Sequence, residues 1–200
     1  MAANTIKFLH TLGKLKETDR TGWVENGIPK PESVSDHMYR AAVMCMMCPD
    51  PTLNRDKLIR MALCHDAGES IVGDISPAMG VSKEEKYRSE KAAVSTLCGL
   101  LDKSIPLSGE LQEYWEEYEM QSTPEAKFLK DIDLLEMVTQ AHAYETAHPE
   151  KDLSSFYLSG EKIQHPWARE IFEKLRSTRP TRSSDRKEES ETTNNTVKSD

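Results

Sequence analysis

Two histidines and two aspartates at separate points of the chain have the chemistry of metal ligands. His65 and Asp66 are adjacent within an otherwise apolar run over residues 61–67. His37 lies upstream of this pair, and Asp133 lies downstream. Imidazole nitrogens combined with carboxylate oxygens suit a divalent transition ion such as Mn, Fe, Co or Zn. An ion held in this way lowers the pKa of bound water and so provides a nucleophile for hydrolysis.

The apolar surroundings of the His-Asp pair favour a bound cation over a solvated acidic patch. Burying the charge of Asp66 without a partner would be costly. Glu69 follows one helical turn later and Asp74 comes shortly after, so further acidic groups gather beside the imidazoles. A single histidine such as His37 is more often a hydrogen-bonded core or surface residue. Its combination with these other groups indicates a metal ligand.

The elements that must position these residues are predicted to be helices. Apolar residues recur at helical spacing, capping residues mark several helix starts, and no segment shows sustained strand alternation. The predicted fold class is therefore all-α, a compact bundle whose site is built from side chains on facing helices. We expect helices over about 4–16, from Ser33, from Asn54 towards His65, from Ser82 to about 101, from Ser108 or Gly109, from Thr123 to about 148, and over about 166–177.

Residues 17–33 are expected to form a functional connecting loop, because glycines and prolines interrupt the helical pattern there. Arg20 in this loop carries a guanidinium whose fork matches phosphate geometry, with a surface charge as the alternative. Trp23 offers an aromatic wall for a substrate, with ordinary packing as the alternative. Tyr118, further along the chain, is expected to pack in the core or at an oligomer surface.

Length, composition and charge limit the classes of protein. The 200 residues, 37% of them hydrophobic, predict a single domain over residues 1–177, and the polar stretch 178–200 is expected to be a disordered tail. A net charge of −8 leaves no broad basic face, so we do not expect long nucleic acid as a partner. No signal core and no apolar run of roughly 18 residues is present. An intracellular, cytoplasmic protein without membrane association is expected.

The ordered set of motifs resembles the HD-domain metal phosphohydrolases, which are named for their His-Asp pair. The resemblance covers roughly residues 4–176. Within that family, the sequence is similar in detail to the 5′-deoxynucleotidase group. The segments that carry it are Arg20-Thr-Gly-Trp-Val, Pro31-Glu-Ser-Val-Ser-Asp-His-Met-Tyr-Arg40, His65-Asp-Ala-Gly-Glu-Ser-Ile-Val-Gly-Asp-Ile75, Trp115-Glu-Glu-Tyr-Glu, Ala126-Lys-Phe and Asp133.

The resemblance implies an enzyme that hydrolyses deoxyribonucleoside 5′-monophosphates to a deoxynucleoside and phosphate. It implies a divalent ion, Mn, Co or Mg with Zn or Fe as further candidates. Relatives commonly form dimers, so a homodimer is expected. By matching position, the main ion would be held by His37, His65, Asp66 and Asp133.

The same resemblance assigns roles to residues around these ligands. Glu69 and Asp74, with the backbone of Ile75, match positions associated with a second ion or with substrate and the nucleophilic water. Arg20 and Trp23 match a loop pair that holds phosphate and presses against the sugar, where crowding would discriminate a 2′-hydrogen from a 2′-hydroxyl.

Phosphomonoester hydrolysis needs positive charge near the phosphoryl oxygens and a positioned nucleophile. Here the ion and Arg20 supply the charge, and Glu69 or Asp74 orients or deprotonates the attacking water. The ligand set alone leaves other substrates open, namely those of a phosphodiesterase, a triphosphohydrolase or a ribonucleotidase. A non-catalytic, metal-stabilised scaffold that recruits partners through its polar tail is the alternative outside enzymes.

Overall fold

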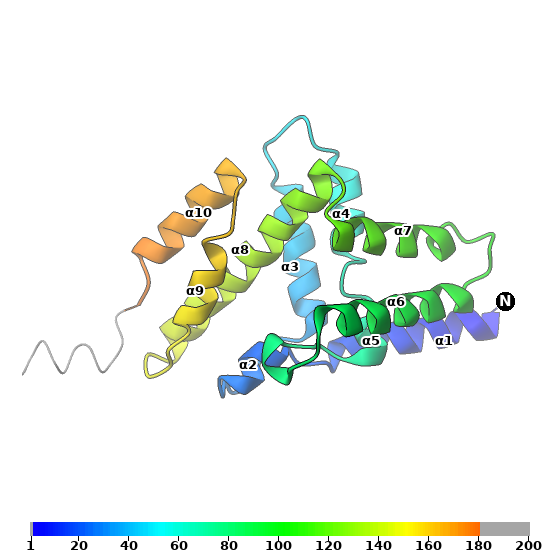
Figure 1. The fold of residues 1–200 in the computed structure, drawn as a ribbon, viewed down its shortest axis with the longest axis horizontal. Coiled ribbons are helices and arrows are strands. Elements are labelled where there is room, and N and C mark those ends of the chain that lie inside the picture. The colour runs from blue at the N-terminus through cyan, green and yellow to red at the C-terminus, as the bar shows by residue number, and fades with distance from the viewer. Residues whose placement is uncertain (1, 181–200) are drawn as a thin grey trace, which may run out of the picture. The chain divides into compact units, whose positions relative to one another are not determined.

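The computed structural model describes residues 2–180 of the chain, and these residues form helices joined by turns and loops (Figure 1). Among the described residues no strand forms, and one isolated antiparallel bridge pairs Asp19 with Ser33. The all-α fold class is therefore confirmed. Most of the predicted tail, residues 181–200, lies outside the described residues.

The chain divides into two compact units, one ending at Asp133 and one beginning at Leu134. The division falls inside helix α8 (Pro124–Ala147). The single domain expected over residues 1–177 stays a prediction. All the residues predicted to do chemistry belong to the first unit. Besides the start of α8, that unit contains α1 (Ala2–Gly13), η1 (Lys14–Lys16), α2 (Thr21–Glu25), α3 (Val34–Met46), α4 (Arg55–Ala62), α5 (Glu69–Val72), η2 (Pro77–Met79), α6 (Lys83–Leu100) and α7 (Leu107–Met120).

Polar side chains begin the longer helices of this unit where the sequence predicts them. Ser33 forms a capping box with Asp36 at the start of α3, which places His37 in the first turns of that helix. Asn54 accepts a hydrogen bond from the backbone N–H of Lys57 and so caps α4. Ser82 caps α6 in the same way. Helix α7 begins slightly earlier than predicted, at Leu107.

Short helices were not predicted from the sequence. Helix α2 lies within the segment 17–33 that was expected to be a loop, and α5 follows the His-Asp pair directly. Elements of four or five residues contain little more than one turn, so they show no apolar period that a sequence pattern could reveal.

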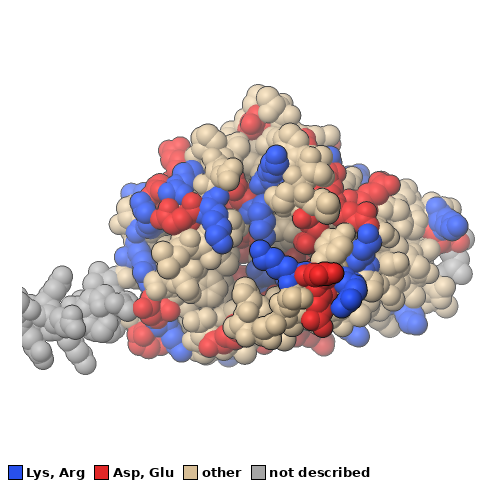
Figure 2. Space-filling view, in the orientation of Figure 1, with Lys and Arg blue, Asp and Glu red and all other residues tan. Residues whose placement is uncertain are grey.

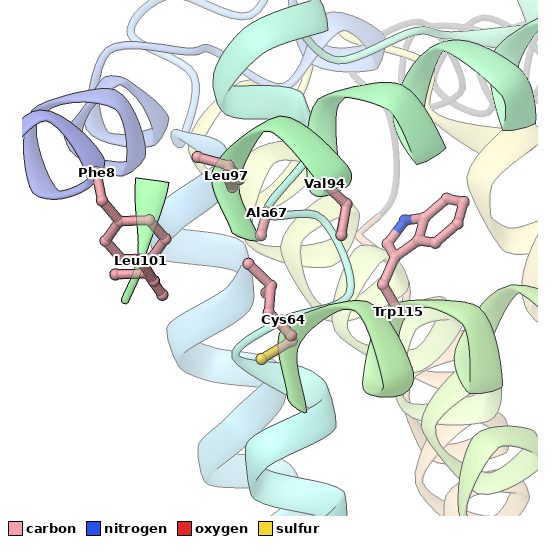
Figure 3. Close-up of a cluster of buried hydrophobic side chains, with 8 residues drawn as sticks. Phe8, Cys64, Ala67, Val94, Leu97, Leu101 and Trp115 are labelled. Carbon is pink, nitrogen blue, oxygen red and sulfur yellow. The ribbon is translucent and has the colours of Figure 1, made fainter. Parts of the chain in front are cut away.

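A cluster of buried apolar side chains packs α1, α6 and α7 around the turn that carries the His-Asp pair (Figure 3). Cys64 and Ala67, which flank that pair, belong to this cluster. Gly68 continues the turn, and a β-carbon there would lie 3.2 Å from the carbonyl oxygen of Glu90 on α6. The apolar cluster and the close approach of α6 therefore fix the turn in place. The cluster consists of Phe8, Cys64, Ala67, Val94, Leu97, Leu101, Leu111 and Trp115.

The second unit contains the end of α8 together with α9 (Ser154–Gly160) and α10 (Pro166–Ser177). Helix α10 has the predicted bounds, whereas α9 was not predicted. Gly160 is buried against Phe172 and Val138, where a β-carbon would have no room. Arg179 pairs with the buried Glu145 through two hydrogen bonds of 2.8 and 2.6 Å.

Hydropathy and charge can also be followed on the described residues. None of the described helices has the length and apolar character needed to cross a membrane. On the face shown in Figure 2, both Lys or Arg and Asp or Glu side chains are exposed among the described residues.

Candidate active site

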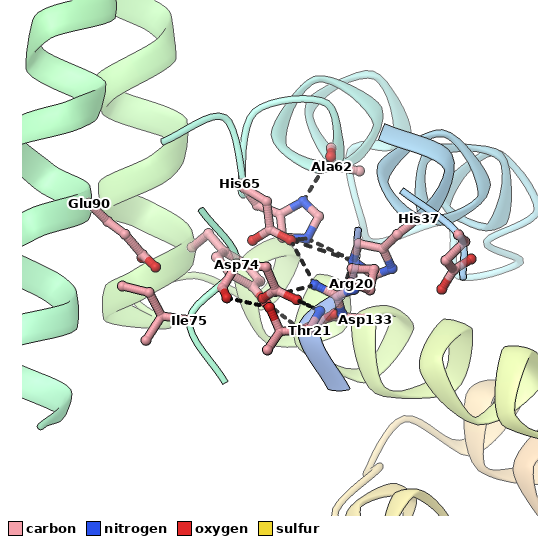
Figure 4. A network of polar contacts seen from close by, with 12 residues as sticks. Arg20, Thr21, His37, Ala62, His65, Asp74, Ile75, Glu90 and Asp133 are labelled. Carbon is pink, nitrogen blue, oxygen red and sulfur yellow. Dashed lines mark hydrogen bonds and ion pairs between the residues drawn. The ribbon is translucent and has the colours of Figure 1, made fainter. Parts of the chain in front are cut away.

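The four predicted metal ligands converge in the first unit (Figure 4). His37 and His65 are fully buried or nearly so, at 0% and 2% exposure, and their Nε2 atoms lie 3.4 Å apart. Asp133 Oδ1 lies 3.3 Å from the Nε2 atom of His37. Asp66 Oδ2 lies 3.3 Å from the Nε2 atom of His65 and 3.7 Å from that of His37. Ligand atoms of His37, His65 and Asp133 thus all lie within 4.8 Å of one another, and Asp66 lies beside the two imidazoles.

The orientation of His65 prepares its Nε2 atom for an ion. Its Nδ1 atom lies 2.8 Å from the carbonyl oxygen of Ala62, and only a protonated Nδ1 can donate to that acceptor. The lone pair of a neutral ring is then on Nε2, inside the cluster. Burial lowers the pKa of His65, although Asp66 opposes this shift. A neutral imidazole is the form that binds metal.

The charge of Asp66 is stabilised by groups of this site. Burial alone would raise its pKa, but the charge that His65 carries when protonated, together with Arg20 and His37, outweighs burial and holds the pKa of Asp66 below its usual value. The Nη1 atom of Arg20 lies 3.5 Å from Asp66 Oδ2 and 3.9 Å from Asp74 Oδ1. The structure therefore places Arg20 beside Asp66 and Asp74, and its role in binding phosphate stays a prediction.

Two hydrogen bonds connect Asp74 to Thr21, the residue that follows Arg20 and begins α2. The backbone N–H of Thr21 donates to Asp74 Oδ2 at 2.6 Å, and the Thr21 hydroxyl donates to the carbonyl oxygen of Asp74 at 2.6 Å. A hydrogen bond between neighbouring residues joins the same two segments: the Ser76 hydroxyl donates to Glu25 in α2 at 2.6 Å. Thr21 was not singled out in the sequence, because only the fold brings it next to a residue 53 positions away.

Glu69 differs from Asp74 in having an oxygen without a partner. Its side chain is 3% exposed, and Oε2 makes no hydrogen bond within the described structure. Burial, reinforced by Asp66 and Asp74, raises the pKa of Glu69 well above its usual value. An orphaned carboxylate oxygen in the interior is rare without a cation or water beside it. This oxygen, together with the clustered imidazole and carboxylate donors, fits a divalent ion.

The backbone of Ile75 meets a lysine that the sequence analysis did not consider. Lys86 on α6 donates to the carbonyl oxygen of Ile75 at 3.3 Å, and its Nζ atom lies 3.5 Å from Glu90 Oε1. Only the approach of α6 to this segment reveals the contact, since 11 residues separate the two partners.

Burial of Glu90 leads to a pH-dependent prediction. Burial raises the pKa of Glu90 from 4.5 to about 7, although Lys86 opposes the shift. Because the folded state disfavours the charged form, Glu90 should reduce stability as pH rises from its unfolded pKa through its folded one. Glu90→Gln should therefore raise the melting temperature of metal-free protein at about pH 8 and change it little at about pH 4. Thermal melts in chelator would check this, with the exposed Glu84→Gln on the same helix as control. Equal shifts at both pH values would contradict it.

Trp23 is placed differently from the other predicted site residues. Its side chain is only 2% exposed, and its Nε1–H donates to Glu32 Oε1 at 2.9 Å. Arg40 donates to the other oxygen of Glu32 at 3.2 Å. These contacts favour the packing alternative for Trp23. Its contact with a substrate sugar stays a prediction.

Asp133 has two partners that the sequence analysis did not assign to the site. The Tyr118 hydroxyl donates to Asp133 Oδ2 at 2.7 Å, and Lys130 Nζ lies 2.8 Å from the same oxygen. Burial would raise the pKa of Asp133, but Lys130 and His37 hold it well below its usual value. Lys130 could have been noticed, because it lies three residues before Asp133 on one helix. Tyr118 comes from another helix and gave no such signal.

Comparison with known proteins gives one consistent result. The family model of the HD domain matches residues 12–172. The 5′-deoxynucleotidase hdd1 of Schizosaccharomyces pombe is 50% identical over 164 residues, which cover 80% of this chain and 83% of the relative. The 5′-deoxynucleotidase HDDC2 of Homo sapiens is 47% identical over 182 residues, which cover 90% and 88% of the two chains.

Solved structures agree with the sequence matches. A conserved hypothetical protein from Pyrococcus furiosus has a TM-score of 0.69 and 32% identity, covering 86% of this chain and 99% of that one. The HD domain-containing protein YGK1 has a TM-score of 0.65 and 29% identity, covering 88% and 85%. The similarity therefore extends over most of each chain.

Proposed function

We propose that this chain, which belongs to the HD-domain family, is a metal-dependent 5′-deoxynucleotidase that hydrolyses deoxyribonucleoside 5′-monophosphates to a deoxynucleoside and phosphate. The observation that carries the proposal is the convergence of His37, His65, Asp66 and Asp133, with the His Nε2 atoms 3.4 Å apart. The relatives named 5′-deoxynucleotidase, about half identical over most of the chain, support the substrate class.

In this proposal the four converging residues hold the divalent ion, which is Mn, Co or Mg with Zn or Fe as further candidates. When bound, the ion supplies positive charge to the phosphoryl oxygens and makes water more acidic. Ala62 contributes by fixing His65 with its Nε2 atom free of a proton. Burial of both imidazoles excludes bulk water and so strengthens electrostatic interactions at the site.

Glu69 and Asp74 take different parts in the reaction. Asp74 accepts a hydrogen bond from the Thr21 N–H and faces Arg20, so it holds Arg20 and the start of α2 in place. Glu69 has an oxygen with no hydrogen-bond partner and is therefore available to orient the attacking water and to accept its proton. Both carboxylates, with the carbonyl of Ile75, also remain the proposed ligands of a second ion. Oxygen donors of this kind suit Mg or Mn.

Arg20 binds the phosphoryl group in this proposal, and its replacement is a direct test. Arg20→Ala should leave Mn content unchanged and lower kcat/KM for dAMP by about 10²-fold, or about 3 kcal/mol, because a charged fork to the phosphoryl oxygens is lost. Arg20→Lys, which keeps the charge but not the fork, should fall between the two. Steady-state kinetics with phosphate detection and elemental analysis would check this. Loss of bound Mn in Arg20→Ala would contradict the role in substrate binding.

A panel of phosphoesters tests the substrate class. Phosphate release from dAMP should exceed release from AMP, and dATP and a phosphodiester should be poor substrates. Equal rates with AMP would remove the 2′-discrimination proposed for Trp23. Faster cleavage of dATP or of the diester would favour a triphosphohydrolase or phosphodiesterase, and no turnover of any of these would favour the metal-stabilised scaffold.

The proposal also includes a homodimer of chains whose HD domain spans residues 1–177. The family match over residues 12–172 supports this extent, because it includes parts of both compact units. Sedimentation analysis of the purified protein would test the dimer. A monomer at micromolar concentration would remove it.

A further inference from the structure

Tyr118 contacts two of the proposed metal ligands, and the proposed function gives neither contact a role. Its hydroxyl donates to Asp133 Oδ2 at 2.7 Å. Its ring meets the His65 imidazole edge-on, with the ring centroids 5.0 Å apart. The side chain is buried at 4% exposure, so both contacts lie in the interior of the first unit.

Lys130 completes a closed set of contacts around the same carboxylate oxygen. Its Nζ atom lies 2.8 Å from Asp133 Oδ2 and donates to the Tyr118 hydroxyl at 3.1 Å. The ammonium also lies over the Tyr118 ring, 5.3 Å from its centroid. Each of the three groups thus contacts the other two. Hydrogen bonds in such a set strengthen one another and fix the groups that make them.

The two oxygens of Asp133 consequently have different surroundings. Oδ2 accepts hydrogen bonds from Tyr118 and Lys130, whereas Oδ1 faces His37 Nε2 at 3.3 Å. Turning the plane of the carboxylate away from this orientation would break both hydrogen bonds. One oxygen is therefore kept on the side of the imidazoles.

We propose that Tyr118 is a positioning residue of the metal centre, which together with Lys130 presents Oδ1 of Asp133 to the ion and fixes the ring of His65. The inference rests on the proposed function only in taking Asp133 and His65 as metal ligands. Groups that orient metal ligands commonly change metal affinity or activity by 10- to 100-fold when they are removed. Tyr118 orients two ligands from a helix that provides none.

The test removes one oxygen atom. Tyr118→Phe keeps the ring that packs on His65 but loses the hydrogen bond to Asp133. Calorimetric titration of metal-stripped protein should show Mn binding weakened by about 10-fold or more. The visible spectrum of the Co-loaded protein should change, because the ligand field depends on how Asp133 is oriented. In chelator the melting temperature should stay near that of the parent, so the rise on adding Mn should shrink.

Tyr114→Phe is the matched control, because Tyr114 lies one turn earlier on α7 and packs against the apolar cluster. It should retain the parent Mn affinity and Co spectrum. Unchanged Mn affinity and an unchanged Co spectrum in Tyr118→Phe would overturn the proposal, whatever the melting temperature. These measurements use no nucleotide. Failure of the proposed function would appear separately, as Mn-loaded parent protein that releases no phosphate from dAMP.

Discussion

Replacing His65 with alanine is expected to remove the bound ion and to lower phosphate release from dAMP by about 10⁴-fold or more. His65 directs its Nε2 atom into the centre of the cluster, 3.3 Å from Asp66 Oδ2 and 3.4 Å from the Nε2 atom of His37. Without it the remaining carboxylates repel one another and the ion loses a nitrogen ligand. Asp66→Ala should have the same effect. Elemental analysis of the purified variants and a phosphate-release assay would measure both consequences.

His10→Ala provides the control for this substitution, because His10 is an exposed histidine of α1. It should keep both metal and activity. The ligand assignment fails if His65→Ala or Asp66→Ala retains as much tightly bound metal as the parent protein. Loss of activity with full metal content would instead place these residues in contact with the substrate.

Glu69→Gln is expected to lower kcat for dAMP by about 10²- to 10⁴-fold while the main ion stays bound. Gln keeps the shape of the side chain but cannot accept a proton from the attacking water. The same change should raise the melting temperature of the metal-free protein at neutral pH. A buried carboxylate with an unpartnered oxygen near Asp66 and Asp74 is replaced by a neutral group that can donate to them. Activity and metal-free stability would thus change in opposite directions.

Asp74→Asn separates the two acidic residues. Its oxygen can still accept the hydrogen bond from the Thr21 N–H, but the charge that faces Arg20 is lost. We therefore expect a higher KM for dAMP and a smaller loss of kcat than in Glu69→Gln. A larger loss of kcat in Asp74→Asn would exchange the roles of the two carboxylates. Unchanged kcat and unchanged metal-free stability in Glu69→Gln would favour the scaffold.

Local signals predicted the parts of this fold that depend on neighbouring residues. Ser33, Asn54 and Ser82 cap the helices that the sequence assigns to them, because the capping hydrogen bond reaches only three residues along the chain. The short helix α2 lies in a segment that was expected to be a loop because of its glycines and prolines, and its five residues carry too little periodicity to indicate a helix. Its existence matters for the site, since it begins immediately after Arg20.

Contacts between distant segments could be predicted only where a motif already linked them. The resemblance joined His37, His65 and Asp133, and the structure brings these residues together. No motif joined Tyr118 to Asp133, and the spacing of an aromatic residue on a helix indicates packing alone. The buried position of Trp23 was likewise not evident, because its hydrogen bond to Glu32 depends on how the loop folds back. Side-chain partners across helices require the packed structure.

The measurement that tests the central claim most directly is phosphate release from dAMP and AMP by metal-stripped protein resupplied separately with Mn, Co, Mg and Zn. The account predicts no release without metal, and release restored by at least one of these ions with dAMP preferred over AMP. Release by the stripped protein at the restored rate would contradict a metal-dependent mechanism. Absence of release from both substrates with metal bound would contradict the deoxynucleotidase activity itself.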